Sequence, residues 1–177
     1  MNKSSFGKKN ALVQIAGFMC TAARTAPKAK GTDNILTMVI SRDSQKKKLV
    51  KRMIDDARRE NKPGFRRDAA NIENSPVIVL IATRTKPIGL TYCGFCGYED
   101  CTHLLKAKGI CAYNALDLGI AVGSAVSIAA DFRVDNRIMY SVGKAAMALN
   151  LFKDKSVKIA FGIPLSASGK NPFFDRK

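Results

Sequence analysis

Four of the five cysteines in this chain lie within nineteen residues of one another, at Cys93, Cys96, Cys101 and Cys111. Their spacing is C-x2-C-x4-C-x9-C, and Gly94 and Gly97 directly follow the first two. Thiolates are the ligands of soft metals, and glycine lets a backbone fold tightly around them. The sequence therefore predicts a metal or redox centre in the segment 90–112.

The spacing favours an iron–sulfur cluster, which accepts one C-x2-C pair with single outlying cysteines. We interpret the four cysteines as ligands of one [4Fe–4S] cluster. Structural zinc more often takes two C-x2-C pairs or Cys/His pairs, so zinc is an alternative, as are reactive thiols or disulfides. His103 is either a further ligand or an exposed side chain. Cys20 lies on an apolar helical pattern and is expected to be a small buried residue.

Length and composition predict one domain, residues 1–177, with the cysteine-rich segment 90–112 as a metal-binding insert. Hydrophobic residues make up 46% of the chain and aromatic residues only 7%, so alanine, valine and isoleucine must form the core. The single histidine leaves no Ser/His/Asp arrangement, and hydrolytic chemistry is unsupported. No stretch reaches the ~20 apolar residues of a membrane span. We expect a cytoplasmic protein with reduced thiols and no membrane association.

The net charge of +16 predicts attraction to phosphate, whether on a nucleotide, a nucleic acid or an acidic partner. A basic solvated surface explains the charge equally well. Two loops, 24–34 and 162–171, combine glycine, hydroxyl groups and lysine as phosphate sites do. Ordinary solvent-facing turns share that composition, and neither loop matches a Walker A or G-x-G-x-x-G pattern.

Periodicity predicts helices at 9–24, 44–60, 112–132 and 136–150, and strands at 35–41, 76–83 and 157–163. The strand 76–83 is apolar throughout, so we expect it to be buried on both faces. The helix 112–132 is apolar almost all round and should lie centrally in the core. Residues 65–74 are expected to form a polar connection, and Asp135 or Asn136 could cap the last helix. This order predicts an α+β or α/β layered domain.

Several longer segments resemble a known family, the uncharacterised ferredoxin-domain proteins of bacteria and archaea. They are AARTAPKAKGTDNI, FRRDAANIENSPVIVLI, CGFCGYEDC, CAYNALDLGIAVGSAV, VDNRIMYSVG and GIPLSASGKNPFFDR. The resemblance covers roughly residues 10–177. It implies a redox theme and a four-cysteine cluster, and it names no substrate.

A looser resemblance links the chain to the FMN-dependent nitroreductase fold. It rests on a helix ending in A-x-x-x-A-P, the DLGIA-x-x-S-A helix and a late strand ending in G-I-P. It implies a layered sheet with flanking helices, a homodimer, and FMN contacts from Pro27, Lys28, Lys30, Asn34, Gly169 and Lys170. The chain departs from nitroreductases in its amino-terminal segment KSSFGKK, which replaces an Arg-Arg-Ser-like arm, and in its cysteine insert.

Together these patterns predict an iron–sulfur redox protein on a nitroreductase-like scaffold. It could be an FMN-dependent oxidoreductase or an electron-transfer protein, acting with a redox partner protein or a small-molecule substrate. The amides of Gly94 and Gly97 are expected to hydrogen-bond cluster sulfurs. The alternative is a zinc-stapled basic module that binds nucleic acid or a partner and does no catalysis.

Overall fold

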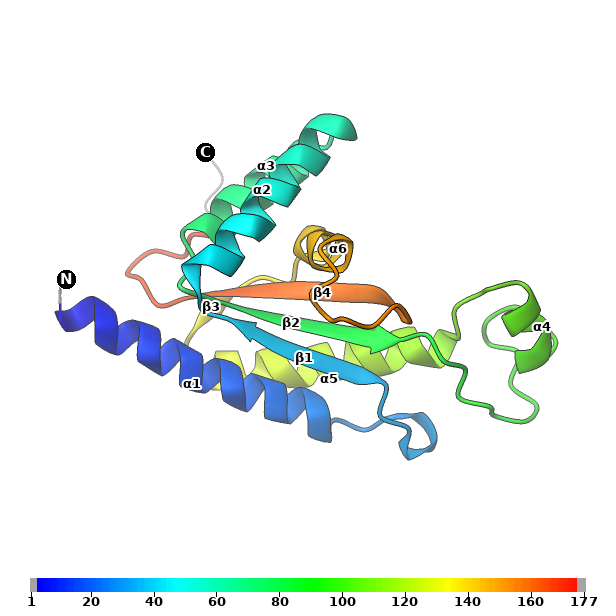
Figure 1. Cartoon of the computed structure of the whole chain (residues 1–177). Coiled ribbons are helices and arrows are strands. Elements are labelled where there is room, and N and C mark those ends of the chain that lie inside the picture. The colour runs from blue at the N-terminus through cyan, green and yellow to red at the C-terminus, as the bar shows by residue number, and fades with distance from the viewer. Residues whose placement is uncertain (1–2, 175–177) are drawn as a thin grey trace.

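The computed structural model describes residues 3–174, which form a four-stranded sheet between two layers of helices (Figure 1). The helices are α1 (Lys3–Thr25), α2 (Asp43–Arg59), α3 (Pro63–Glu73), α4 (Cys101–Lys106), α5 (Ala112–Asp131) and α6 (Tyr140–Ala148), with a 3-10 turn η1 (Ala29–Gly31). The strands are β1 (Ile35–Ile40), β2 (Val77–Arg84), β3 (Asp135–Asn136) and β4 (Val157–Ser166).

The strands lie in the order β1-β2-β4-β3, and every neighbouring pair is antiparallel. This arrangement is an α+β fold, one of the two classes that the order of elements predicted. The central strand β2 is buried along seven of its eight residues, as its apolar run predicted. Its side chains alternate between two separate cores, with Val79 on one face and Leu80 on the other.

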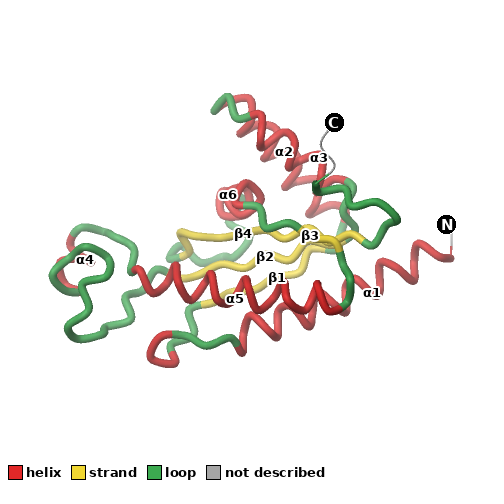
Figure 2. The backbone as a smooth tube through the Cα atoms, turned by 180° about the vertical axis from the view of Figure 1, so that it is seen from behind, coloured by secondary structure: helices red, strands yellow, loops and turns green. Residues whose placement is uncertain are grey.

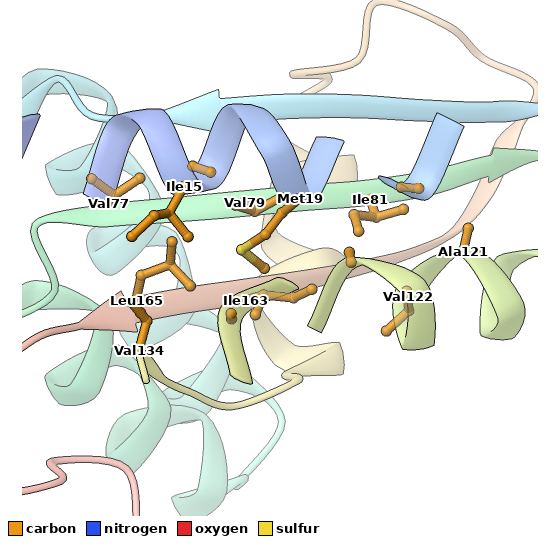
Figure 3. Packing of buried hydrophobic residues seen from close by; sticks show 14 of the residues in the cluster. Ile15, Met19, Val77, Val79, Ile81, Ala121, Val122, Val134, Ile163 and Leu165 are labelled. Carbon is orange, nitrogen blue, oxygen red and sulfur yellow. The ribbon is translucent and has the colours of Figure 1, made fainter. Parts of the chain in front are cut away.

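Helices α1 and α5 cover the first face of the sheet (Figure 2). Figure 3 shows Ile15 and Met19 of α1 packed over Val77, Val79 and Ile81 of β2, with α5 completing the cluster. The apolar residues at helical spacing in α1 therefore form one stripe that is buried against the sheet, as predicted.

Helix α5 is covered on one side only, which corrects the expectation that it lies centrally in the core. Leu118, Ala121 and Ala125 are buried, whereas Leu116 and Ile120 on the outer side are 52% and 47% exposed. Among the described residues, α5 is the one helix long and apolar enough to cross a membrane by length and composition, a property the sequence reading had not assigned to any stretch. Here it packs against α1, β1 and β2.

Helices α2, α3 and α6 cover the second face of the sheet (Figure 1). Two glycines let α6 lie directly on β4. A β-carbon on Gly143 would stand 1.8 Å from the carbonyl oxygen of Ala160, and one on Gly162 would stand 2.2 Å from a methyl group of Val142. Helix α6 can therefore approach β4 this closely only because Gly143 leaves room for the backbone of β4 and Gly162 leaves room for the side chain of Val142.

Two local predictions were wrong. Residues 65–73 form most of α3 and Asn74 is its C-cap; the helix begins at Pro63, whose missing N–H is harmless in the first helical turn. Phe65, Ala69 and Ile72 then recur at helical spacing and are buried. Asp135 and Asn136 form β3 and pair with β4, so neither caps α6, which begins four residues later at Tyr140.

Replacing Gly143 by alanine should destabilise the fold. The added methyl group must displace the backbone of β4, and such overpacking costs about 3 kcal/mol or more of unfolding free energy. Chemical denaturation followed by circular dichroism measures the loss. Gly64→Ala is the matched control, since nothing lies within 4 Å of its added β-carbon. Equal stability of the Gly143→Ala protein and the unchanged chain would contradict the packing described here.

Candidate metal centre

The cysteine-rich segment leaves the sheet where β2 ends at Arg84 and returns at the start of α5 (Figure 1, right side). It carries the short helix α4, which the sequence analysis did not predict. A small apolar cluster of Ile88, Leu104 and Cys111 holds the segment together. Ala29 of η1 and Tyr113 of α5 pack against that cluster, so the segment is anchored to the main body.

All four cysteines of the segment line one cavity of about 390 Å³. Cys111 is buried, the other three are half-buried, and all are free thiols. They come from different local structures. Cys93 and Cys96 lie in the glycine loop (residues 92–97), Cys101 is the first residue of α4, and Cys111 directly precedes α5. The fold thus brings the four predicted ligands to one hollow from positions up to eighteen residues apart.

The four thiols share this hollow without meeting at a single point. Among the described residues, no three His, Cys, Asp or Glu side chains stand close enough to hold one metal ion. A single tetrahedral zinc at a Zn–S distance of about 2.3 Å needs sulfurs roughly 3.8 Å apart. A four-iron cluster takes each thiolate at a different corner and so spaces the sulfurs more widely.

The glycine loop depends on glycine at two positions. Gly94 and Gly97 have φ angles of +66° and +81°, which side chains other than glycine rarely adopt. The N–H of Gly97 donates to the carbonyl oxygen of Gly94 at 2.9 Å and closes a tight turn. That amide is therefore engaged in the turn, where the sequence analysis expected it to face a cluster sulfur.

His103 serves as part of a helix cap in this structure. The carboxylate of Asp100 accepts a hydrogen bond from the backbone N–H of His103 and a second from its Nδ1, both at 2.8 Å. These bonds, the backbone one first, hold the pKa of Asp100 below its usual value. His103 is not among the residues that line the cysteine cavity.

The loop after α1 lies against the cysteine segment. Lys30 Nζ donates to the carbonyl oxygen of Gly89 at 3.3 Å. From the other side, the buried carboxylate of Asp117 on α5 accepts the N–H of Ala29 at 3.1 and 3.2 Å. This role of Asp117 was not predicted, although a carboxylate in an apolar helix is a usable signal because it needs a partner when buried.

Lys28, which was expected to contact flavin, caps the end of α1. Its side chain is only 5% exposed. Its Nζ donates to the carbonyl oxygens of Ala23, Arg24 and Ala26 at 3.1, 2.6 and 2.8 Å, and lies 3.9 Å from Asp33. A cation that satisfies the last carbonyls of a helix is a stabilising contact.

Asp33, in the loop after α1, interacts with the residues around it. Burial on its own raises the pKa of Asp33, but hydrogen bonds from Arg24 and from the N–H of Ile35, together with the nearby charges, lower it overall. Unlike Asp33, the next residue Asn34 is buried, and its amide donates to the Oδ1 of Asn114 at 3.0 Å. Of the four expected flavin contacts in this loop, Pro27 and Lys30 remain exposed.

Gly169 and Lys170 lie at the opposite end of the sheet. They follow β4 beyond Leu165, which pairs with Val77 at the start of β2, whereas the cysteine segment follows the other end of β2. Seven residue steps along that strand span roughly 23 Å. The structure therefore does not bring the two halves of the expected flavin site together within one chain.

Cys20 lies apart from the cavity, on α1. It is half-buried beside the first core, close to the expectation of a buried small residue. Burial raises the pKa of its thiol, and this outweighs the opposing effects of the Thr37 hydrogen bond and the Arg24 charge.

Comparisons with known proteins identify the family. Residues 107–176 match the family described as "Uncharacterized protein containing a ferredoxin domain (DUF2148)". An uncharacterized protein from Archaeoglobus fulgidus is 39% identical over 186 residues, covering 99% of this chain and 97% of its own length. The chain belongs to this ferredoxin-domain family, as its segments predicted.

Solved structures show that the fold is nitroreductase-like. A BluB-like flavoprotein from Clostridium difficile 630 has a TM-score of 0.61 and 18% identity, covering 89% of this chain and 84% of its own. Nitroreductase A from Vibrio parahaemolyticus has a TM-score of 0.58 at 13% identity, and the NADPH:FMN oxidoreductase from Vibrio harveyi has 0.58 at 11%. Both matches cover 93% of this chain, which spans only 61% and 63% of the two Vibrio proteins. Family and fold together support a redox role.

Replacing Lys28 by alanine should lower stability, because three carbonyl groups at the end of α1 lose their donor. We expect a loss of about 1–2 kcal/mol in the free energy of unfolding, measured by urea denaturation. Lys30→Ala is the control and should change it by less than about 0.5 kcal/mol, since its side chain is exposed and its one hydrogen bond, to Gly89, is a solvent-exposed contact of 3.3 Å. If both variants matched the unchanged chain, Lys28 would have no structural role.

Proposed function

We propose that this member of the ferredoxin-domain family is an iron–sulfur redox protein in which Cys93, Cys96, Cys101 and Cys111 hold one [4Fe–4S] cluster. The observation that carries the proposal is that these four free thiols line one cavity. A bound cluster supplies one-electron transfer. The chain's own residues supply the ligands, the enclosure and the surface through which a partner is reached.

The surroundings of the cavity suit an anionic centre near the surface. Cys111 immediately precedes α5, a helix of twenty residues whose amino end favours negative charge. Tyr92 and Phe95 of the glycine loop are strongly exposed, and Phe95 stacks on Tyr113 with ring centres 5.7 Å apart. These aromatic side chains give a redox partner protein or small-molecule substrate an apolar surface next to the thiols.

Fewer observations support a flavin site than support the iron–sulfur cluster. Two structural neighbours carry a flavin or FMN in their names, yet the six expected contacts do not form one site in this chain. Lys28 and Asn34 are engaged in structural hydrogen bonds, and Gly169 and Lys170 lie at the far end of the sheet. An FMN site here would need residues of a second chain, and no step of the proposed function passes through flavin.

A homodimer is the second part of the proposal. Exposed apolar side chains lie on α5, directly after it and on the adjacent α1: Leu116, Ile120, Phe132 and Phe18. The rings of Phe18 and Phe132 stack with centres 6.0 Å apart. Between the apolar residues of α5, Gly119 and Gly123 have open space where a side chain would stand, which permits close approach of another backbone. We propose that a second copy of the chain covers this face.

The cluster is tested by purification without oxygen. We expect a brown protein with about four iron and four sulfide per chain, whose visible absorbance bleaches on reduction with dithionite. Cys96→Ser and Cys101→Ser should each lose most of the iron. Cys20→Ser is the matched control and should keep it, because Cys20 does not line the cavity. A colourless chain with one zinc per molecule would overturn the proposal in favour of the zinc-stapled alternative.

The dimer is tested by light scattering after size-exclusion chromatography. Ile120→Asp places a charge in the middle of the apolar face, and we expect it to weaken self-association by at least tenfold. Ile138→Asp is the control, since Ile138 is similarly exposed but lies outside α1 and α5. A chain that is monomeric at every concentration would contradict the proposed interface without affecting the cluster.

A further inference from the structure

A second cavity lies on the opposite face of the sheet from α1 and α5. It measures about 870 Å³ and lies between the turn that joins α2 to α3, helix α6 and the segment leading into β4. Cavities of roughly 300–1,000 Å³ accommodate whole small molecules. The cysteine segment contributes no residue to its lining, so this cavity is separate from the proposed cluster site.

The acidic groups of the cavity are already neutralised. Arg52 and Arg59 both contact the buried carboxylate of Asp56, at 3.0 and 2.6 Å. Arg59 also contacts Glu60 at 2.8 Å. Asp154, the third acidic residue of the lining, contacts an arginine outside the cavity at 2.8 Å. The carboxylates are therefore not available to the remaining cations.

Four further lysines of the lining project into solvent: Lys62, Lys144, Lys155 and Lys158. Within the part of the chain that the structure describes, none of them has an acidic partner or a hydrogen-bond acceptor. They come from three separate segments and surround one hollow. Uncompensated ammonium groups that face a common space attract phosphate more strongly than the same groups scattered on a surface.

An aromatic ring lies beside these cations. Tyr140 opens α6 and is 59% exposed, and its ring meets the buried ring of Phe65 edge-on, with centres 5.5 Å apart at 85°. Phe65 therefore supports Tyr140 and leaves much of its surface open to the cavity. Lys144 lies four residues further along the same helix and so on the same side of it as Tyr140.

We infer that this cavity binds a nucleotide, with its phosphates on the lysines and its base against Tyr140. The combination of unpaired cations, one exposed ring and a bounded volume matches a phosphate joined to a flat heterocycle. A nucleic-acid strand fits less well, because strand-binding grooves offer several aromatic rings in succession. Inorganic phosphate makes no use of the ring. The inference is independent of the cluster and survives its failure.

Binding is measured with the fluorescent probe mant-ADP and the full chain at moderate ionic strength, and specificity by competition with unlabelled ADP. We expect saturable binding with a dissociation constant below about 1 mM. The double variant Lys144→Ala/Lys158→Ala should weaken it at least tenfold. Tyr140→Leu should weaken it about tenfold, whereas Tyr140→Phe, which keeps the ring, should bind within about twofold of the unchanged chain.

The matched control is Lys47→Ala/Lys51→Ala, which removes the same charge from α2 outside the cavity. It should leave the dissociation constant within about twofold. If the control variant weakened binding equally, the binding would be due to the overall positive charge of the protein and not to this cavity, and the inference would be overturned. It is also overturned if no saturable binding occurs, if pyrophosphate competes as well as ADP, or if a single-stranded oligonucleotide displaces the probe at lower concentration than ADP.

Discussion

Burial of β2 between two helical layers is the constraint on which the other contacts depend. Alternate side chains of this strand enter different cores, so neither layer can shift without exposing half of the strand. The strand also sets the position of the candidate site, since the cysteine segment begins where β2 ends and finishes where α5 begins. One end of the segment is thus fixed by a strand and the other by a helix, although the segment itself is largely irregular.

Buried amides, more than ion pairs, fasten the cysteine segment to this body. The side chains of Asn34 and Asn114 bond to each other, and both donate to the carbonyl oxygen of Lys86 at the start of the segment. Neutral hydrogen bonds of this kind are not screened by salt and do not titrate. Asp117 adds one charged acceptor for the backbone of η1. The loop after α1, the start of the segment and α5 are thereby held as one unit beside the thiols.

The sequence was sufficient where a residue pattern acts locally. The apolar run of β2 predicted a strand buried on both faces, and the helical stripe around Ile15 and Met19 predicted a helix lying on it. Whether α3 existed depended on Pro63, which ends a helix in one position and begins one in another. A local reading chose the wrong alternative, and the burial of Phe65 and Ile72 shows which one tertiary packing selects.

In the candidate site too, residues that depend on local spacing were easier to predict than residues that depend on long-range geometry. Cys93 and Cys96 needed only their spacing to be chosen, because ligands three residues apart are near each other in any fold. The flavin residues depended on long-range geometry, since β4 runs antiparallel to β2 and so carries Gly169 away from Pro27. The composition of a single strand does not indicate whether it runs parallel or antiparallel to its neighbour. The role of Lys28 was equally hidden, because a lysine near a helix end can face either a ligand or the helix's own carbonyls.

The sheet also separates two kinds of surface. Helix α5 carries just two charged residues, one of them the buried Asp117, whereas α2 carries seven lysines and arginines in seventeen residues. Helix α2 alone therefore carries a net charge of +4, on the layer where we propose that a phosphate-bearing ligand binds. The opposite layer offers an apolar outer face suited to a second copy of the chain. The thiols lie where β2 ends and α5 begins, and their cavity shares no lining residue with the cavity on the basic layer.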